Sequence, residues 1–199
     1  MQPAQLKAFQ LGIRRCLNRS EECQRSVSGF TDLSGVEADR FFGFHFKAYS
    51  PVAFRSCRRL FGVDPRQFKD SLCSGPLEDF PNPGASGSIF YLTKDRQYII
   101  KSVQRKEARC CQMMLPAYYR HLEANPLTLL PKLCGLYSFQ TGRNTMRLIV
   151  MKNLFSSTDR LDHKYDLKGS TFGRLASGKE RKMSPTFKDL DFLAKYPTE

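Results

Sequence analysis

Apolar residues at helical spacing mark the first part of the chain. Residues 4–17 carry apolar side chains three and four positions apart, which predicts a short amphipathic helix. Ser50–Pro51 and Asp64–Pro65 each combine an N-cap residue with a proline at the first helical position, so each begins a further helix, and Gly62 ends the first of these. Residues 18–45 show no regular pattern and are expected to form an irregular connector. We expect three arginines of the helix after Pro51 to face solvent: Arg55, Arg58 and Arg59.

From residue 77 onwards the pattern changes to strands and turns. Residues 89–92 and 98–103 are short apolar runs rich in β-branched and aromatic residues, which predict two strands. A helix follows over about residues 106–123, and Pro116 is expected to break or kink it. Residues 133–152 have the pattern of a hairpin. Two strands, a helix and two more strands indicate an α+β fold, an antiparallel sheet with helices packed on it.

The composition fits a folded chain with a basic surface. Of the 199 residues, 41% are hydrophobic and 12% aromatic, which is enough for one domain or slightly more. The formal net charge is +13, and residues 46–111 hold 12 Lys and Arg against 6 Asp and Glu. This excess suits an anionic partner, such as phosphates, an acidic membrane surface or nucleic acid. A solvated basic face without any partner has the same composition.

Membrane spans and secretion signals are not indicated. No apolar stretch reaches the roughly 18 residues of a spanning helix, and the N-terminus lacks the apolar core of a secretory signal. We therefore expect a soluble or peripheral intracellular protein.

The cysteines and histidines suggest no metal site or catalytic dyad. The seven cysteines contain no Cys-x-x-Cys pair, so we expect reduced thiols, with a disulfide or a metal site as the alternative. His45, His121 and His163 stand far apart in the sequence. Neither a metal-ligand cluster nor Ser/His or Cys/His catalysis is supported.

A small-residue turn followed by a strand that contains a lysine is the first candidate for chemistry. The turn consists of Gly84, Ala85, Ser86, Gly87 and Ser88. Its glycines let the backbone approach a phosphate closely, and its small side chains leave N–H groups free to donate. Lys101 would add a positive charge at the α- and β-phosphates, and Glu107 is the nearby acidic candidate to hold it, because position 109 is Arg. Gly-Ser turns are also common without a ligand, and strand lysines often only reach for solvent.

The second candidate is the segment Lys164–Thr171, in which charges alternate. A strand-like spacing would place Asp166 and Lys168 on one face. Such a pair could organise a phosphate or metal site, or could be an exposed ion pair worth under about 1 kcal/mol. The basic residues that follow, in a stretch with Ser, Gly and Pro, are on their own typical of a solvated loop: Arg174, Lys179, Arg181, Lys182 and Lys188.

Six segments together resemble a known family. In order they are FKAYSPVAFRSCRRLFGVDPRQFKDSLC, NPGASGSIFY, YIIKSVQRKE, LPAYYRHLEANPLTLLPKLCGLY, KYDLKGST and PTFKDLDFL. They resemble the phosphatidylinositol phosphate kinases, most closely type I, the phosphatidylinositol-4-phosphate 5-kinases. The resemblance runs from about residue 46 to 193, and QLGI at residues 10–13 is similar to the opening of the type I core.

The resemblance implies a fold related to the protein kinases and to SAICAR synthase. Residues 1–45 would be an N-terminal helix and connector, residues 46–152 the N-terminal lobe that covers ATP, and residues 153–199 the start of the C-terminal lobe, with the DLKGS segment and a basic loop. The segment that joins the lobes would hold adenine through backbone groups of Val150, Met151, Lys152 and Asn153.

The resemblance also implies roles for single residues. Residues 84–88 would cover the ATP phosphates, Lys101 would bind them, and Glu107 matches a family acidic position and would pair with Lys101. Asp166 and Lys168, in the DLKGS motif, are associated in the family with the ATP and phosphoinositide phosphates and are counted with Lys101 as catalytic candidates. The candidates for the phosphoinositide are Lys168, Arg174, Arg181 and Lys182. No metal ligand is assigned.

The implied reaction transfers the γ-phosphate of ATP, with Mg²⁺, to the 5-hydroxyl of phosphatidylinositol 4-phosphate, and yields phosphatidylinositol 4,5-bisphosphate. The implied partners are that lipid and an anionic membrane surface, with a homodimer and no nucleic acid. The implied location is the cytoplasm, peripheral at the plasma membrane. A nucleic-acid-binding domain is disfavoured because no zinc, helix-turn-helix or RNP-type pattern is present.

The sequence also departs from the family. It contains no MDYSLL-type segment with the family's catalytic Asp, no Asp-containing metal-binding motif and no activation loop. We therefore expect a fragment or truncated product, in which the region that sets 4- versus 5-hydroxyl specificity is missing. The alternative to a lipid kinase is a non-catalytic, truncated kinase lobe that engages a partner or an anionic membrane.

Overall fold

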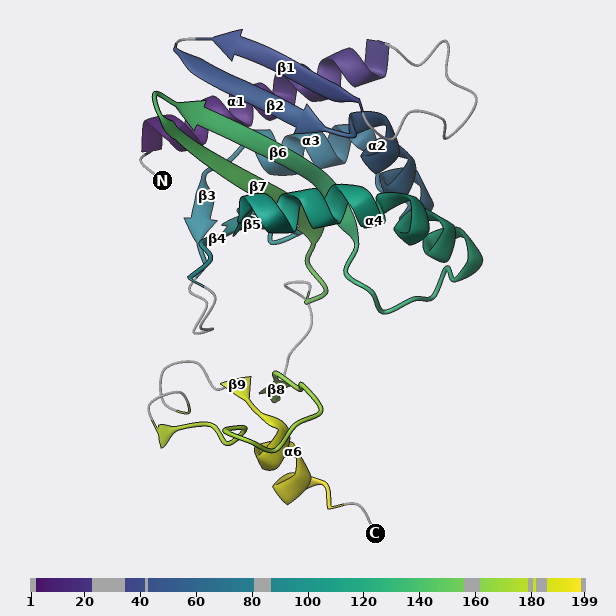
Figure 1. The fold of residues 1–199 in the computed structure, drawn as a ribbon, viewed down its shortest axis with the longest axis vertical. Coiled ribbons are helices and arrows are strands. Elements are labelled where there is room, and N and C mark those ends of the chain that lie inside the picture. Colours follow the sequence, from purple (N-terminus) through teal and green to yellow (C-terminus); the bar gives the residue numbers. More distant parts are fainter. Residues whose placement is uncertain are drawn as a thin grey trace. The chain divides into compact units, whose positions relative to one another are not determined.

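A computed structural model describes residues 3–22, 35–41, 43–80, 87–155, 162–178, 181 and 186–197. The chain divides into two compact units, residues 1–156 and 157–199, which are described separately (Figure 1). The helices of the first unit are α1 (Pro3–Glu22), α2 (Pro51–Leu60), α3 (Pro65–Cys73) and α4 (Arg105–Ala124). Its strands are β1 (Val36–Phe41), β2 (Phe44–Tyr49), β3 (Leu77–Asp79), β4 (Phe90–Thr93), β5 (Tyr98–Val103), β6 (Leu133–Thr141) and β7 (Asn144–Lys152). The second unit contains β8 (Lys164–Tyr165), β9 (Thr186–Phe187) and α6 (Asp189–Lys195).

The strands of the first unit form one antiparallel sheet of seven strands. Their order is β1-β2-β6-β7-β5-β4-β3. The predicted hairpin is the β6–β7 pair, which turns at Gly142 with a positive φ of 56°, a conformation that glycine adopts without strain. The expectation of an α+β fold with an antiparallel sheet and packed helices is confirmed.

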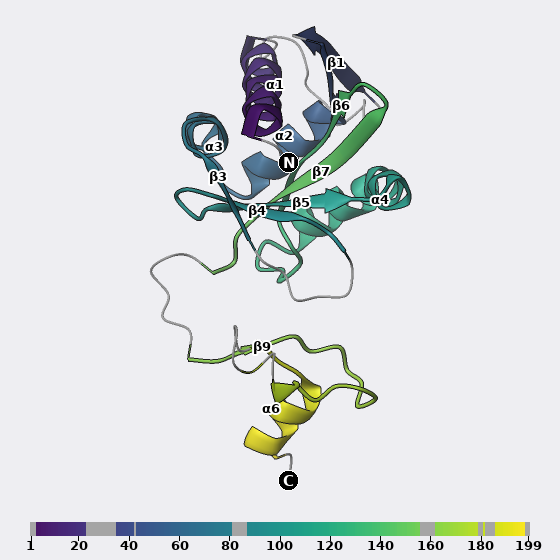
Figure 2. The same ribbon diagram turned by 90° about the vertical axis from the view of Figure 1, so that its left-hand side faces the viewer.

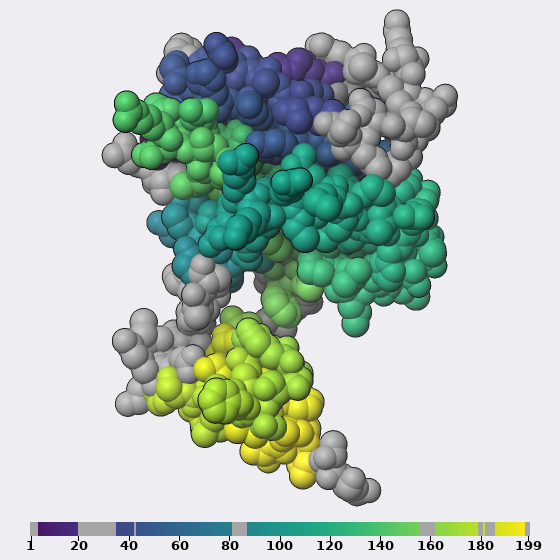
Figure 3. Space-filling model, viewed as in Figure 1, coloured from purple at the N-terminus to yellow at the C-terminus, as the bar shows by residue number. Residues whose placement is uncertain are grey.

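Helices cover both faces of this sheet. Side chains alternate along β7, so Leu148 and Val150 join the core under α1 and α3, whereas Ile149 joins a second core under α2 and α4. Figure 2 shows α1 and α3 on one side of the sheet and α4 on the other. Figure 3 shows α4 in teal across much of the visible surface of this unit. The side chain of a sheet residue therefore lies either under α1 and α3 or under α2 and α4, and this also holds for the lysine of β5.

Helix α1 is longer than predicted and is part of the core. It extends from Pro3 to Glu22, beyond the predicted residues 4–17. Phe9 and Ile13 are fully buried, and the Phe9 ring centroid lies 6.1 Å from those of Phe46 and Tyr137. The Gln10 side chain donates to the carbonyl groups of Leu72 and Gly75, which ties α1 to the end of α3.

The irregular connector predicted for residues 18–45 is wrong in its last part. Residues 36–41 form β1, the edge strand that pairs with β2. Of its six residues only Phe41 is buried, so the strand has no apolar alternation for a sequence pattern to reveal. Residues 23–34 lie outside the described residues.

Helices α2 and α3 begin at the predicted prolines, and Asp64 caps α3 by accepting the N–H of Gln67 at 2.9 Å. The prediction that Arg58 faces solvent is wrong. Its guanidinium is buried, donates to the Cys134 carbonyl at 2.7 Å and lies 4.7 Å from the centroid of the Phe68 ring. The long side chain thus satisfies a buried carbonyl between α2 and β6.

Helix α4 continues past Pro116, so the expected break does not occur. Six cysteines are described as free thiols, and burial raises the pKa of Cys16, Cys57 and Cys134 to about 12. In the described part of the chain, no helix combines the length and the apolar character needed to cross a membrane.

Candidate functional site

The small-residue segment predicted to cover a phosphate is the connection between β3 and β4. These strands pair antiparallel, and the Phe80 N–H donates to the Phe90 carbonyl at 2.9 Å, so the two ends of the connection meet. Gly87 and Ser88 are described, whereas Gly84, Ala85 and Ser86 lie outside the described residues. The predicted loop therefore joins two paired strands.

The end of this loop is bonded to the strand that carries Lys101. The Ile89 N–H donates to the Ser102 hydroxyl oxygen and the Ser102 N–H donates to the Ile89 carbonyl, both at 2.8 Å. Gly87, two residues earlier, has a φ of +62°, which favours glycine. These two hydrogen bonds thus fix the end of the loop beside Ser102, the residue that follows Lys101.

Lys101 lies beside the strand that follows the loop. It pairs with Phe90 on β4 and with Ile149 on β7, and residues opposite each other in a ladder share a face of the sheet. Lys101 therefore points to the face that α2 and α4 cover. Its Nζ lies 5.8 Å from the centroid of the Phe90 ring, within the range of a cation–π contact. Its side chain is partly exposed.

Glu107, the predicted partner of Lys101, stabilises the start of its own helix. Its carboxylate accepts the N–H of Gln104 at 2.6 Å and completes a capping box of α4. Lys101 and Glu107 are both described, and no ion pair joins them. Their pairing in a nucleotide complex stays a prediction.

The segment predicted to hold adenine is anchored to the rest of the first unit. Val150 is fully buried within β7, and Met151 lies opposite Ile99. The Lys152 N–H donates to the Lys132 carbonyl, and the Asn153 N–H donates to the carbonyl of Gln97.

The side-chain amide of Asn153 also donates, through Nδ2, to the Arg96 carbonyl at 2.8 Å and to the Phe155 carbonyl at 2.7 Å. The backbone N–H groups of Lys152 and Asn153 are therefore already paired, and the adenine role of this segment stays a prediction.

In the second unit, Asp166 and Lys168 follow the two-residue strand β8 and are not themselves in a strand. Their side chains nevertheless meet, with 3.2 Å between the Lys168 Nζ and Asp166 Oδ2. Both are exposed, at 58% and 47% of the side chain, so the ion pair itself contributes little stability. The predicted pairing of the two residues is present, but the predicted strand spacing is not its cause.

The basic stretch that follows is more than a solvated loop. The Arg174 side chain is only 12% exposed, and its Nε donates to Asp189 Oδ2 at 2.7 Å. Arg174 also pairs with Asp166, and Arg181 pairs with the Asp191 carboxylate. Lys182 lies outside the described residues. The structure thus brings Asp166, Lys168 and Arg174 together.

Sequence reasoning missed Asp189 as the residue at the centre of this arrangement. Its carboxylate accepts from the guanidinium of Arg174 and from backbone N–H groups, and this holds the pKa of Asp189 well below its usual range. The carboxylates in PTFKDLDFL signal a helix start, which favours contacts with N–H groups of that helix and does not point to residues 168–170.

The described residues do not assemble a metal site. Among them no group of three His, Cys, Asp or Glu side chains is placed to hold a metal ion. The carboxylates of Asp166, Asp189 and Asp191 are instead paired with cations or N–H groups. These residues therefore do not fit Mg²⁺ by themselves.

Comparison with known proteins agrees with the sequence resemblance. A family model described as "Phosphatidylinositol-4-phosphate 5-Kinase" matches residues 71–198. The chain is 53% identical over 161 residues to "Phosphatidylinositol 4-phosphate 5-kinase type-1 sktl" of Drosophila melanogaster, with 80% of this chain and 20% of that protein covered. It is 53% identical over 161 residues to the type-1 alpha kinase of Rattus norvegicus, with 80% and 30% covered. For the type-1 beta kinase of Homo sapiens the identity is 53% over 157 residues, with 78% and 29% covered. The chain thus spans between a fifth and a third of the length of these relatives.

Proposed function

Because the chain belongs to the phosphatidylinositol-4-phosphate 5-kinase family, we propose that it forms the lobe that holds the ATP phosphates in such a kinase. The reaction is transfer of the γ-phosphate of ATP to the 5-hydroxyl of phosphatidylinositol 4-phosphate. One observation carries the proposal: Lys101 lies beside Phe90, on the strand bonded to the end of the β3–β4 connection. In this proposal the small-residue loop and the Lys101 ammonium act on the same phosphates.

The small-residue loop and Lys101 have different roles in the proposed reaction. Phosphoryl transfer depends mainly on positioning and on charge stabilisation, since the charge spreads over the phosphate oxygens. Backbone N–H groups of residues 84–88 orient those oxygens, and the small side chains allow close approach. Lys101 neutralises the α- and β-phosphates from a strand whose backbone is paired with strands on both sides. Glu107 is the proposed partner of Lys101. The segment Val150–Asn153 is the proposed partner of adenine.

The second unit supplies the proposed contacts to phosphates of the lipid or of ATP. Lys168 presents an exposed ammonium next to Asp166, and both remain catalytic candidates. Arg174, Arg181 and Lys182 are the further candidates for the phosphoinositide. The excess of positive charge suits an anionic membrane and supports, as part of the proposal, action at the cytoplasmic face of the plasma membrane. A homodimer is part of the same proposal.

Mg²⁺ is expected for phosphoryl transfer in this family, where it would offset charge on the phosphates. Since the described residues do not form a site for it, no step of the proposal depends on a particular metal ligand in this chain.

Equilibrium binding to the whole chain tests the proposal. ATP should bind about tenfold more tightly than AMP, because AMP lacks the phosphates that Lys101 and the loop contact. Vesicles containing phosphatidylinositol 4-phosphate should bind more tightly than phosphatidylserine vesicles of equal charge. Equal affinities for ATP and AMP would refute the nucleotide role. Vesicle binding without ATP binding would instead favour a non-catalytic lobe that engages membranes.

A further inference from the structure

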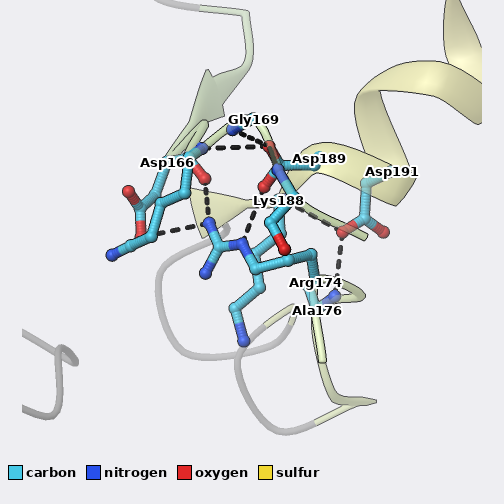
Figure 4. Close-up of polar contacts among 9 residues, drawn as sticks. Asp166, Gly169, Arg174, Ala176, Lys188, Asp189 and Asp191 are labelled. Atoms are coloured by element: carbon cyan, nitrogen blue, oxygen red, sulfur yellow. Dashed lines mark hydrogen bonds and ion pairs between the residues drawn. The ribbon is translucent and has the colours of Figure 1, made fainter. Parts of the chain in front are cut away.

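Three consecutive backbone N–H groups converge on one carboxylate in the turn after β8. The N–H groups of Lys168, Gly169 and Ser170 donate to Asp189 Oδ1 at 2.9, 2.8 and 3.4 Å (Figure 4). Successive N–H groups that point to one spot form a concave site for an anion. Asp189 is only 7% exposed. The anion that fills this site is therefore part of the chain itself.

The same carboxylate connects the turn to an arginine. Asp189 Oδ2 accepts from Arg174 Nε at 2.7 Å, and the Arg174 guanidinium donates back to the Asp166 carbonyl and lies 3.4 Å from the Asp166 carboxylate. Figure 4 shows Asp189 between the turn and Arg174. Residues 166–174 are thus closed into a ring of contacts through one side chain. Charge-assisted hydrogen bonds of this kind are stronger than neutral ones.

The contacts leave the Lys168 side chain exposed. The backbone N–H of Lys168 is used by Asp189, whereas its side chain is 58% exposed. A phosphate that approaches the segment finds its N–H groups occupied and the Lys168 ammonium accessible.

We propose that Asp189 is a positioning residue for phosphate binding by Lys168. Its carboxylate occupies the N–H groups of residues 168–170 and holds the turn in the one conformation from which the ammonium reaches a phosphate. The inference rests on the proposed function, because it assumes that Lys168 binds phosphate. The phosphate belongs either to ATP or to a phosphoinositide headgroup, so both are used as probes.

A double-mutant cycle on the whole chain tests this. Lys168→Met, Asp189→Asn and the double variant are compared for binding of ATP and of phosphatidylinositol 4-phosphate vesicles. Each single substitution should weaken binding of at least one probe about tenfold. The double variant should bind no more weakly than Lys168→Met, because Asp189 acts through Lys168. The probe that loses affinity identifies the source of the phosphate.

Asp191→Asn is the matched control on the same helix. The Asp191 carboxylate accepts the N–H groups of Ala176 and Lys188 and pairs with Arg181, but makes no contact with residues 168–170. Because Arg181 keeps its charge and its hydrogen bond to the Ala176 carbonyl in this variant, binding of both probes should stay within about twofold of the unsubstituted chain. An equal loss in Asp191→Asn and Asp189→Asn would overturn a specific positioning role.

The outcomes separate the inference from the function on which it rests. If Lys168→Met leaves both probes unaffected, the phosphate role of Lys168 is wrong, and the inference fails with it. If Lys168→Met weakens binding but Asp189→Asn does not, only the positioning role of Asp189 is wrong. The same conclusion follows if the losses of affinity in the two single variants add fully in the double variant.

A measurement on the unsubstituted chain avoids any folding defect of the variant. The Gly169 amide proton resonance should stay in place when inositol 1,4-bisphosphate, the soluble headgroup of the lipid, saturates the chain. A large shift of that resonance would mean that phosphate displaces Asp189 from the turn, which contradicts the inference.

Discussion

Lys101→Met should weaken ATP binding to the chain by about tenfold to a hundredfold, the range expected for losing a hydrogen bond to a charged group. The ammonium lies on the same sheet face as Phe90, and the next residue is bonded to the end of the β3–β4 connection. Methionine keeps the length and apolar stem of the side chain but removes the charge that offsets the phosphates. Isothermal titration with ATP measures the effect.

Lys106→Met is the control for Lys101→Met. Lys106 is exposed in the first turn of α4, so its substitution removes the same charge from nearby without touching the β4–β5 ladder. Its ATP affinity should fall by less than about twofold, since exposed charges are screened. Similar losses in both variants would mean that ATP responds only to overall charge, and Lys101 would lose its assigned role.

Phe9→Ala should lower the free energy of unfolding of the first unit by about 3–5 kcal/mol. Phe9 is fully buried, and its ring contacts those of Phe46 and Tyr137 under the sheet. Alanine leaves a cavity between α1 and the sheet, where close packing cannot fully relax. Urea unfolding followed by circular dichroism measures the loss.

The control for Phe9→Ala is Lys7→Ala, which lies on the exposed side of the same helix. Because alanine favours helix and no core contact is lost, its stability should change by no more than about 0.5 kcal/mol. If Phe9→Ala were equally mild, α1 would not be part of the core and the first unit would have to be redefined.

The fold could be predicted where apolar periodicity and cap residues coincide. Asp64 and Pro65 identified the start of α3, and the hairpin pattern of residues 133–152 identified β6 and β7. Strand β1 could not be found in this way, since an edge strand needs only one buried residue when its backbone is satisfied by β2. Arg58 was misplaced because helical spacing alone does not reveal a carbonyl, here that of Cys134, that needs a donor.

The candidate site was predictable only as far as residue types indicate chemistry. The sequence singled out Lys101 and the small-residue loop. The pairing of β4 with β5 then showed that Lys101 lies opposite Phe90, on the strand that follows the loop. Glu107 was chosen by proximity along the chain, but in the structure its carboxylate caps α4. Asp189 is 21 residues from Lys168, so only the folded turn could reveal their contact.

The most direct test of the proposed nucleotide role is lysine-directed labelling of the chain with an acyl-phosphate derivative of ATP. This reagent transfers an acyl group to an amine that lies against the nucleotide phosphates, and peptide mass spectrometry identifies the labelled residue. The proposed geometry predicts that Lys101 is acylated and that excess ATP, but not AMP, protects it. Acylation spread over exposed lysines such as Lys106, or labelling of Lys101 that ATP does not reduce, would contradict the proposal.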